Sequence, residues 1–135
     1  MIKGLYPFGL NHYRSLKFQK LRKLISKNQR KIKVEGAYGS SLSFLLIDIF
    51  SSINQQIFYI SNSKETASYV YSDIIGLIGE KNCSFLPSNY RSDTKKIKDE
   101  SNIINRSKTI RDILDKETKI IAVSYTHLRA HETRS

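Results

Sequence analysis

The chain has 135 residues, the length of one domain, and its 39% hydrophobic content is enough to build a core. A single cysteine excludes an intramolecular disulfide, and no stretch approaches the roughly 18 apolar residues of a membrane span, so we expect a cytoplasmic protein. The formal net charge of +11 is concentrated in residues 1–34, which hold ten basic residues and no acidic one.

The N-terminal arm, residues 1–30, is both basic and amphipathic. Its apolar residues recur at near-helical spacing, which predicts a helix from about Tyr13 to Lys27 lying on the domain. Such a basic face can contact DNA weakly and without sequence preference, or it can be a solvated helix face. The candidate nucleic-acid contacts are Arg14, Lys17, Lys20, Arg22, Lys23 and Lys27.

A glycine-containing loop follows a predicted first strand, Ile32–Glu35. Its template is G-x-x-x-x-G-K-[ST], in which backbone amides cradle phosphates and the lysine neutralises them. Gly36 and Ser43 match this template, but Ser41 replaces the second glycine and Leu42 replaces the lysine. Leucine can neither donate a hydrogen bond nor offset negative charge.

The loop therefore predicts nucleotide-binding architecture without nucleotide chemistry: a vestigial site with no catalytic residue and no cofactor. The alternative is a plain strand–turn–helix junction whose glycines serve the turn. The residues of the vestigial loop are Gly36, Gly39, Ser40, Ser41, Leu42 and Ser43.

The helix that follows the loop is strongly apolar on one side, which predicts burial. Asp48 lies off this stripe, so we expect it to be solvated rather than catalytic. The stripe follows the i, i+3, i+4 rule through Leu42, Leu45, Leu46, Ile49, Phe50 and Ile53.

A second strand, Gln56–Ser61, precedes a capping box at Asn62–Glu65, and Gly79 stops the next helix. That helix has one apolar face, formed by Ala67, Val70, Tyr71, Ile74, Leu77 and Ile78.

A third strand, Asn82–Leu86, leads into an exposed loop over residues 88–99. We expect a helix from about Ser101 to Lys116 that buries Ile103, Ile110, Ile113 and Leu114, and a fourth strand starting at Lys119–Ala122. Alternating strands and helices predict an α/β fold: a three-layer parallel sheet with helices on both faces, spanning residues 31–122.

Residues 123–135 differ from the rest of the chain, with two of its three histidines and no Lys, Asn or Ile. The run resembles one reading frame of a sequencing-library adaptor, so we expect a non-native tail on the N-terminal part of a longer protein. His127 and His131 stand four apart, a spacing that suits a metal on a helix, but no third ligand is visible. We therefore predict no metal site.

The order of segments resembles the N-terminal module of the bacterial transcription-repair coupling factor (Mfd) family, in its Bacteroidetes-like form. The resemblance covers about Ser15 to Ala122. It is carried by SLKFQKLRKLIS, KIKVEGAYGSSLSFLL, IFYISNSKETASYVYSDIIGLIG, NCSFLPSNYR and KTIRDILDKETKIIAVS, in that order. That module is similar in turn to the first domain of UvrB, which keeps a working phosphate loop. The substitutions at Ser41 and Leu42 fit the degenerate version.

The resemblance implies a degenerate P-loop NTPase-like, UvrB domain 1-like fold, incomplete at its C-terminus, that acts as a non-catalytic scaffold. It implies a parent protein that displaces stalled RNA polymerase by ATP-driven translocation on DNA and recruits UvrA, through domains C-terminal to this module. Two alternatives stay open: an active helicase or ATPase domain, and a small basic nucleic-acid-binding protein.

Overall fold

The computed structural model describes residues 16–87 and 96–125 and shows an α/β fold. Its elements in chain order are α1 (Leu16–Ser26), α2 (Ser40–Ile53), β1 (Ile57–Ser61), α3 (Lys64–Ile78), the 3-10 turn η2 (Glu80–Asn82), β2 (Cys83–Leu86), α4 (Lys96–Leu114) and β3 (Ile120–Ser124). Within these residues, no helix is long and apolar enough to cross a bilayer.

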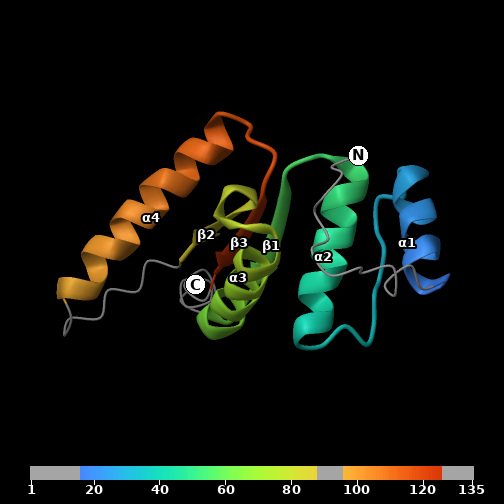
Figure 1. The fold of residues 1–135 in the computed structure, drawn as a ribbon, viewed down its shortest axis with the longest axis horizontal. Coiled ribbons are helices and arrows are strands. Elements are labelled where there is room, and N and C mark those ends of the chain that lie inside the picture. Colours follow the sequence, from blue (N-terminus) through green and yellow to red (C-terminus); the bar gives the residue numbers. More distant parts are fainter. Residues whose placement is uncertain (1–15, 88–95, 126–135) are drawn as a thin grey trace, which may run out of the picture.

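The three strands form one parallel sheet in the order β1-β3-β2, so the last strand in the chain lies at the centre (Figure 1). Ile120 of β3 is in register with Ile57 of β1 on one side and with Cys83 of β2 on the other. The chain thus passes from β1 over to β2 and then turns back to β3. Because crossovers between parallel strands are right-handed, this reversal requires α3 and α4 to lie on opposite faces of the sheet.

Side-chain contacts agree with that requirement. On β2, the Phe85 ring stacks on Tyr71 of α3 with centroids 5.5 Å apart, whereas the neighbouring Ser84 donates a hydrogen bond to Asp112 of α4. Successive residues of a strand point to opposite faces. The prediction of a parallel sheet with helices on both faces is therefore correct for the described elements.

The core lies between the sheet and the pair α2 and α3. Its central side chains come from four elements and are Leu46, Ile47, Phe50, Val70, Ile74, Cys83 and Ile120. The periodicity of α2 predicted three of its six buried positions, Leu45, Leu46 and Phe50, but missed Ile47, which is 1% exposed. α2 is covered from two sides, since it packs against α3 and also against α1, so its buried arc is wider than one stripe.

The predicted strand Ile32–Glu35 is wrong. Residues 32–35 form no strand in the structure, and their backbone makes no hydrogen bond to the backbone of any described residue. A sequence of high β-propensity forms a strand only when a neighbouring strand offers backbone hydrogen bonds. In the described sheet, β1 occupies the place beside β3, and this segment does not. Of the four predicted strands, the described residues contain three.

The face predicted for α4 is also wrong. Ile103, Ile110 and Leu114 were expected in the core but are 59%, 41% and 74% exposed, while Thr109 and Asp112 are buried. The helix presents a polar side to β2 because that strand offers a hydroxyl and a carbonyl there: Ser84 Oγ lies 2.7 Å from Asp112 Oδ2, and Thr109 Oγ1 donates to the Phe85 carbonyl at 2.8 Å.

Three boundaries shift. α4 already includes residues 96–99, which were expected in a loop; residues 88–95 lie outside the described part. The cap of α3 is Ser63 rather than Asn62: its Oγ accepts from the Thr66 amide at 3.2 Å. β3 continues to Ser124, so its last two residues belong to the run expected to be a tail; His127 and His131 lie outside the described residues.

Candidate functional site

The loop before α2 is shaped by two glycines. Gly36 has φ +84° and Gly39 has φ +56°, a region that side chains with a Cβ rarely adopt. Gly39 is also the N-cap of α2, and it provides no side-chain cap. These glycines thus serve the turn into the helix. This is what the alternative interpretation, a plain strand–turn–helix junction, predicted for them.

The first amides of α2 are already hydrogen-bonded within the chain. The Ser41 amide donates to the Tyr38 carbonyl at 3.2 Å, and the Leu42 amide donates to the Gly39 carbonyl at 3.1 Å. The Ser41 hydroxyl also donates to the Tyr38 carbonyl, at 2.6 Å. A phosphate loop works because such first-turn amides are free to point at the anion. Here two of them are not free.

The two positions that carry the chemistry of a working loop are used for packing. Leu42, in the lysine position, packs against the core cluster of α2 and α3. Ser43, in the position of the hydroxyl that holds Mg²⁺, is fully buried, and its Oγ lies 3.1 Å from Asp73 Oδ2 of α3. Both side chains join α2 to α3 instead of facing a ligand.

The loop borders two cavities. On the α3 side, a cavity of about 410 Å³ has Asp73 in its lining and no basic residue, so a phosphate there would meet like charge. On the α1 side, a cavity of about 530 Å³ has mainly apolar walls, with Lys20, Lys33 and Glu35 as its charged residues.

The predicted nucleic-acid contacts separate into two groups. Lys20, Lys23 and Lys27 are exposed and recur at helical spacing on one side of α1 and its C-terminal turn. Arg22 instead points inward, with Nε 3.2 Å from Asp48 Oδ2. Arg14 lies outside the described residues, and of Lys17 only its place in α1 is described.

The expectation that Asp48 is solvated is wrong. Asp48 is 8% exposed, because α1 covers this side of α2. Desolvation raises the pKa of its carboxyl, and the Arg22 charge only partly offsets this. The two facing atoms lie at ion-pair distance without the geometry of a hydrogen bond. The pair fixes α1 to α2 and leaves Arg22 poorly placed for an external ligand.

A buried polar cluster under α4 was not predicted. Asp112 Oδ2 receives hydrogen bonds from Ser84 Oγ at 2.7 Å and from Lys119 Nζ at 3.0 Å, and Lys119 also reaches Glu117 at 2.8 Å. All but Glu117 are less than 10% exposed. The only sequence signal was Thr109 and Asp112, polar residues three apart on one side of a helix.

Opposing effects set the pKa values of this pair. Desolvation raises the pKa of Asp112, but the hydrogen bonds from Ser84 and Lys119 and the Lys119 charge outweigh it, so the pKa is lowered. Desolvation lowers the pKa of Lys119, but its bonds to Glu117 and Asp112 outweigh it, so the pKa is raised. These bonds join α4 to β2 and to Lys119, the residue before β3.

Metal ligation finds no support in residues 16–87 and 96–125, where no three His, Cys, Asp or Glu side chains gather. The described fold and loop define an α/β domain with a small parallel sheet and a glycine turn before an apolar helix. Comparison of the chain with models of known families, with curated proteins and with solved structures gives no match.

Proposed function

We propose that this chain is a non-catalytic scaffold module of the transcription-repair coupling type, with a P-loop-like, UvrB-like arrangement that has lost nucleotide chemistry. One observation carries the proposal: Leu42 and Ser43, the positions of the phosphate-binding lysine and the Mg²⁺-binding hydroxyl, both pack between α2 and α3. Selection for packing at these positions is expected in a module that is kept for its shape.

The strand ends support the same proposal over an active ATPase. Phosphoryl transfer in P-loop enzymes needs an acidic residue that holds Mg²⁺ near the phosphates. The three described strands end at Ser61, Leu86 and Ser124, none of which has a carboxylate. Asp73, the carboxylate nearest to the loop serine, already accepts that serine's hydrogen bond.

A nucleotide assay tests the loss of chemistry. We expect no ATP hydrolysis and no Mg·ATP affinity tighter than millimolar, because no lysine offsets the phosphate charge and the Ser41 and Leu42 amides are already bonded within the chain. The double variant Ser41→Gly, Leu42→Lys should still show no turnover, since no described strand ends at a carboxylate and Asp73, the one beside Ser43, already accepts the Ser43 hydrogen bond. Micromolar ATP binding to the unmodified chain in a calorimetric titration would refute the proposal.

The family part of the proposal has its own test. In that family, ATP-driven translocation, contact with RNA polymerase and recruitment of UvrA belong to domains C-terminal to this module. The source gene, read on from the codon of Ala122, should encode a complete translocase motor. A stop codon there, or a downstream region of another class, would contradict the coupling-factor assignment while leaving the scaffold assignment intact.

A second candidate function, weak DNA contact, is favoured by the exposed face of Lys20, Lys23 and Lys27. Binding should lack sequence preference and should weaken with salt at a log–log slope of about −0.9 per phosphate contact. The triple variant to glutamine should remove that slope. Binding that does not change between low and high salt would exclude an electrostatic contact.

A further inference from the structure

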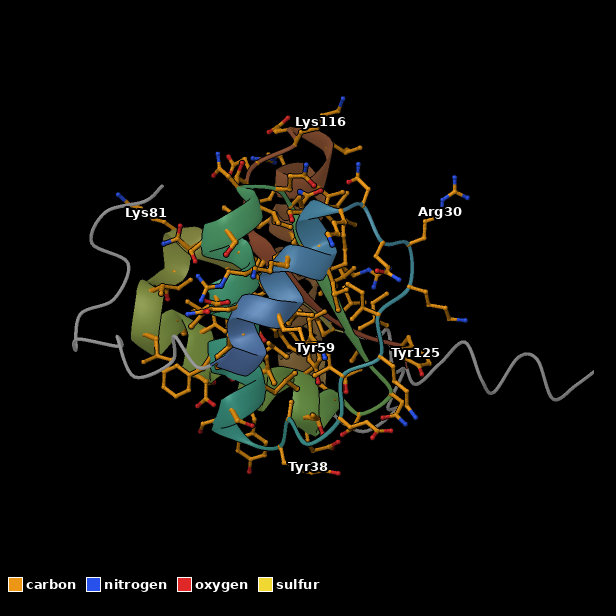
Figure 2. All side chains as sticks on the ribbon, turned by 90° about the vertical axis from the view of Figure 1, so that its right-hand side faces the viewer. Arg30, Tyr38, Tyr59, Lys81, Lys116 and Tyr125 are labelled. Carbon is orange, nitrogen blue, oxygen red and sulfur yellow. The ribbon has the colours of Figure 1, made fainter. Side chains whose placement is uncertain are left out.

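The cavity between α1, the segment 32–37 and the start of α2 is an apolar groove that the loop chemistry does not use. Its volume is about 530 Å³, in the range of ligand sites. Figure 2 views the molecule from the α1 side, and the segment between Arg30 and Tyr38 runs alongside that helix. The apolar walls come from three parts of the chain and are Phe18, Leu21, Leu24, Ile32, Val34 and Leu45.

The backbone along this groove is available for pairing. Residues 31–37 make no backbone hydrogen bond to any described residue, and their sequence alternates as a strand does, with Ile32 and Val34 both lining the groove. Exposed N–H and C=O groups beside an apolar groove are the features by which proteins bind an extended segment through strand addition. An extended occupant is therefore favoured over a helical one.

The charge around the groove is one-sided. The charged residues of its lining are two lysines and one glutamate. Lys20 and Lys33 line the groove itself, and Lys33 pairs with Glu35 at 2.5 Å. The side chains of Lys33 and Glu35 are 85% and 75% exposed. Exposed ion pairs contribute little stability, so an incoming carboxylate can replace Glu35. The surroundings favour an acidic occupant.

We propose that this groove binds an extended, acidic amphipathic segment of a partner protein. Alternate apolar side chains of the segment enter the cavity, its backbone pairs with residues 32–36, and its outward carboxylates face Lys20 and Lys33. This inference does not depend on the proposed coupling function, since it uses none of the vestigial loop's missing chemistry.

A nucleic acid fits these features less well. Phosphates would satisfy the lysines but would leave the apolar walls and the free backbone unused. Proteins that bind single strands stack bases on grouped aromatic rings, and Phe18 is the only aromatic residue among the described residues lining this groove. DNA bound through the face of Lys23 and Lys27 would not fill the cavity.

The probe is a capped, fluorescein-labelled peptide of about eight alternating leucine and glutamate residues, long enough to span residues 32–36 at about 3.3 Å per residue. Fluorescence anisotropy with the full chain should show saturable, micromolar binding that weakens with salt. Serine–glutamate and leucine–lysine peptides should bind at least about tenfold more weakly. Equal binding of the leucine–lysine peptide, or binding of a short DNA duplex in preference to the leucine–glutamate peptide, would overturn the proposal.

Paired variants locate the site. Ile32→Ser with Val34→Ser, and separately Lys20→Glu, should each weaken binding about tenfold. Their matched controls, Ile103→Ser with Ile104→Ser on α4 and Lys81→Glu at η2, change exposed residues of the same types elsewhere and should leave affinity unchanged. Figure 2 shows Lys81 on another side of the molecule from Arg30.

Hydrogen–deuterium exchange on the unmodified chain keeps the test independent of variant folding. Peptide binding should slow exchange at the amides of residues 32–36. Binding without that protection, or no binding because the chain's own residues fill the groove, would overturn the proposal.

Discussion

Replacement of Asp112 by asparagine should be among the most damaging conservative changes in this domain. The asparagine has the same size and can still accept the Ser84 hydrogen bond, so the change removes a charge and leaves no cavity. What it leaves is the Lys119 ammonium, 9% exposed, with Nζ 3.0 Å from a neutral group in place of a carboxylate. Its remaining charged partner is Glu117, whose side chain is 47% exposed.

The magnitude follows from what is left unpaired. Removing one partner of a buried ion pair typically costs about 3–5 kcal/mol, and Glu117 keeps part of the compensation, so we expect about 3 kcal/mol. For a domain stable by about 5–15 kcal/mol this is a large share, and it corresponds to a fall in Tm of about 10 °C. Replacing both partners with apolar residues, Asp112→Leu with Lys119→Met, should recover most of the loss.

Urea unfolding followed by circular dichroism measures the effect, with the exposed Asp115→Asn, in the turn directly after α4, as the control. Because the folded pKa of Asp112 is lowered, its contribution is present above the unfolded pKa of about 3.9 and is lost as pH falls through the folded value. The Lys119 pKa is raised, so its contribution is lost only as pH rises through the folded value, above about 10.4. A cost for Asp112→Asn no larger than for Asp115→Asn would refute the buried pair.

Three further outcomes are expected. Asp48 has a raised pKa, so stability is lost as pH rises from the unfolded pKa of about 3.9 to the raised folded value. Asp48→Asn should therefore change the unfolding free energy by less than about 1 kcal/mol, whereas Arg22→Met should cost about 2 kcal/mol by leaving the carboxylate unpaired. The reverse order of the two costs in urea unfolding would contradict this. Burial raises the pKa of the Cys83 thiol to about 12, so at about pH 8 a thiol reagent should react with it only on unfolding, and rapid reaction of the native chain would show an open core. Ser63→Ala should cost about 1 kcal/mol by thermal unfolding and Asn62→Ala little, with equal costs arguing against the observed cap.

Elements with their own local signals could be predicted from the sequence. The apolar stripes of α2 and α3, the strand that became β1 and the glycine that ends α3 all depend on residues within one element. The face of α4 could not be predicted in this way. Its isoleucines obey the periodicity, but the helix turns Thr109 and Asp112 toward β2, where Ser84 and a backbone carbonyl need partners. That choice depends on a strand over twenty residues away in sequence.

The residues of the candidate site differ in the same way: some of their roles could be predicted from the local sequence, and others could not. The loss of the lysine at Leu42 is visible in the motif, since it needs only the template. The loss of Ser43 is not visible, because serine matches the template and only the contact with Asp73, thirty residues later, shows that its hydroxyl is occupied. Arg22 is similar: as one of many basic residues it resembled a ligand contact, and its pairing with Asp48 depends on how α1 packs on α2.

The central claim, that the loop before α2 no longer receives phosphate, is tested most directly by amide spectroscopy. Two-dimensional ¹H–¹⁵N spectra of the labelled chain, recorded during a Mg·ATP titration, report on each amide from Gly36 to Ser43. We predict that these signals stay in place up to millimolar nucleotide, because the Ser41 and Leu42 amides remain bonded to Tyr38 and Gly39. Saturable shifts of these amides at micromolar Mg·ATP would show that the loop still binds nucleotide and would contradict the account.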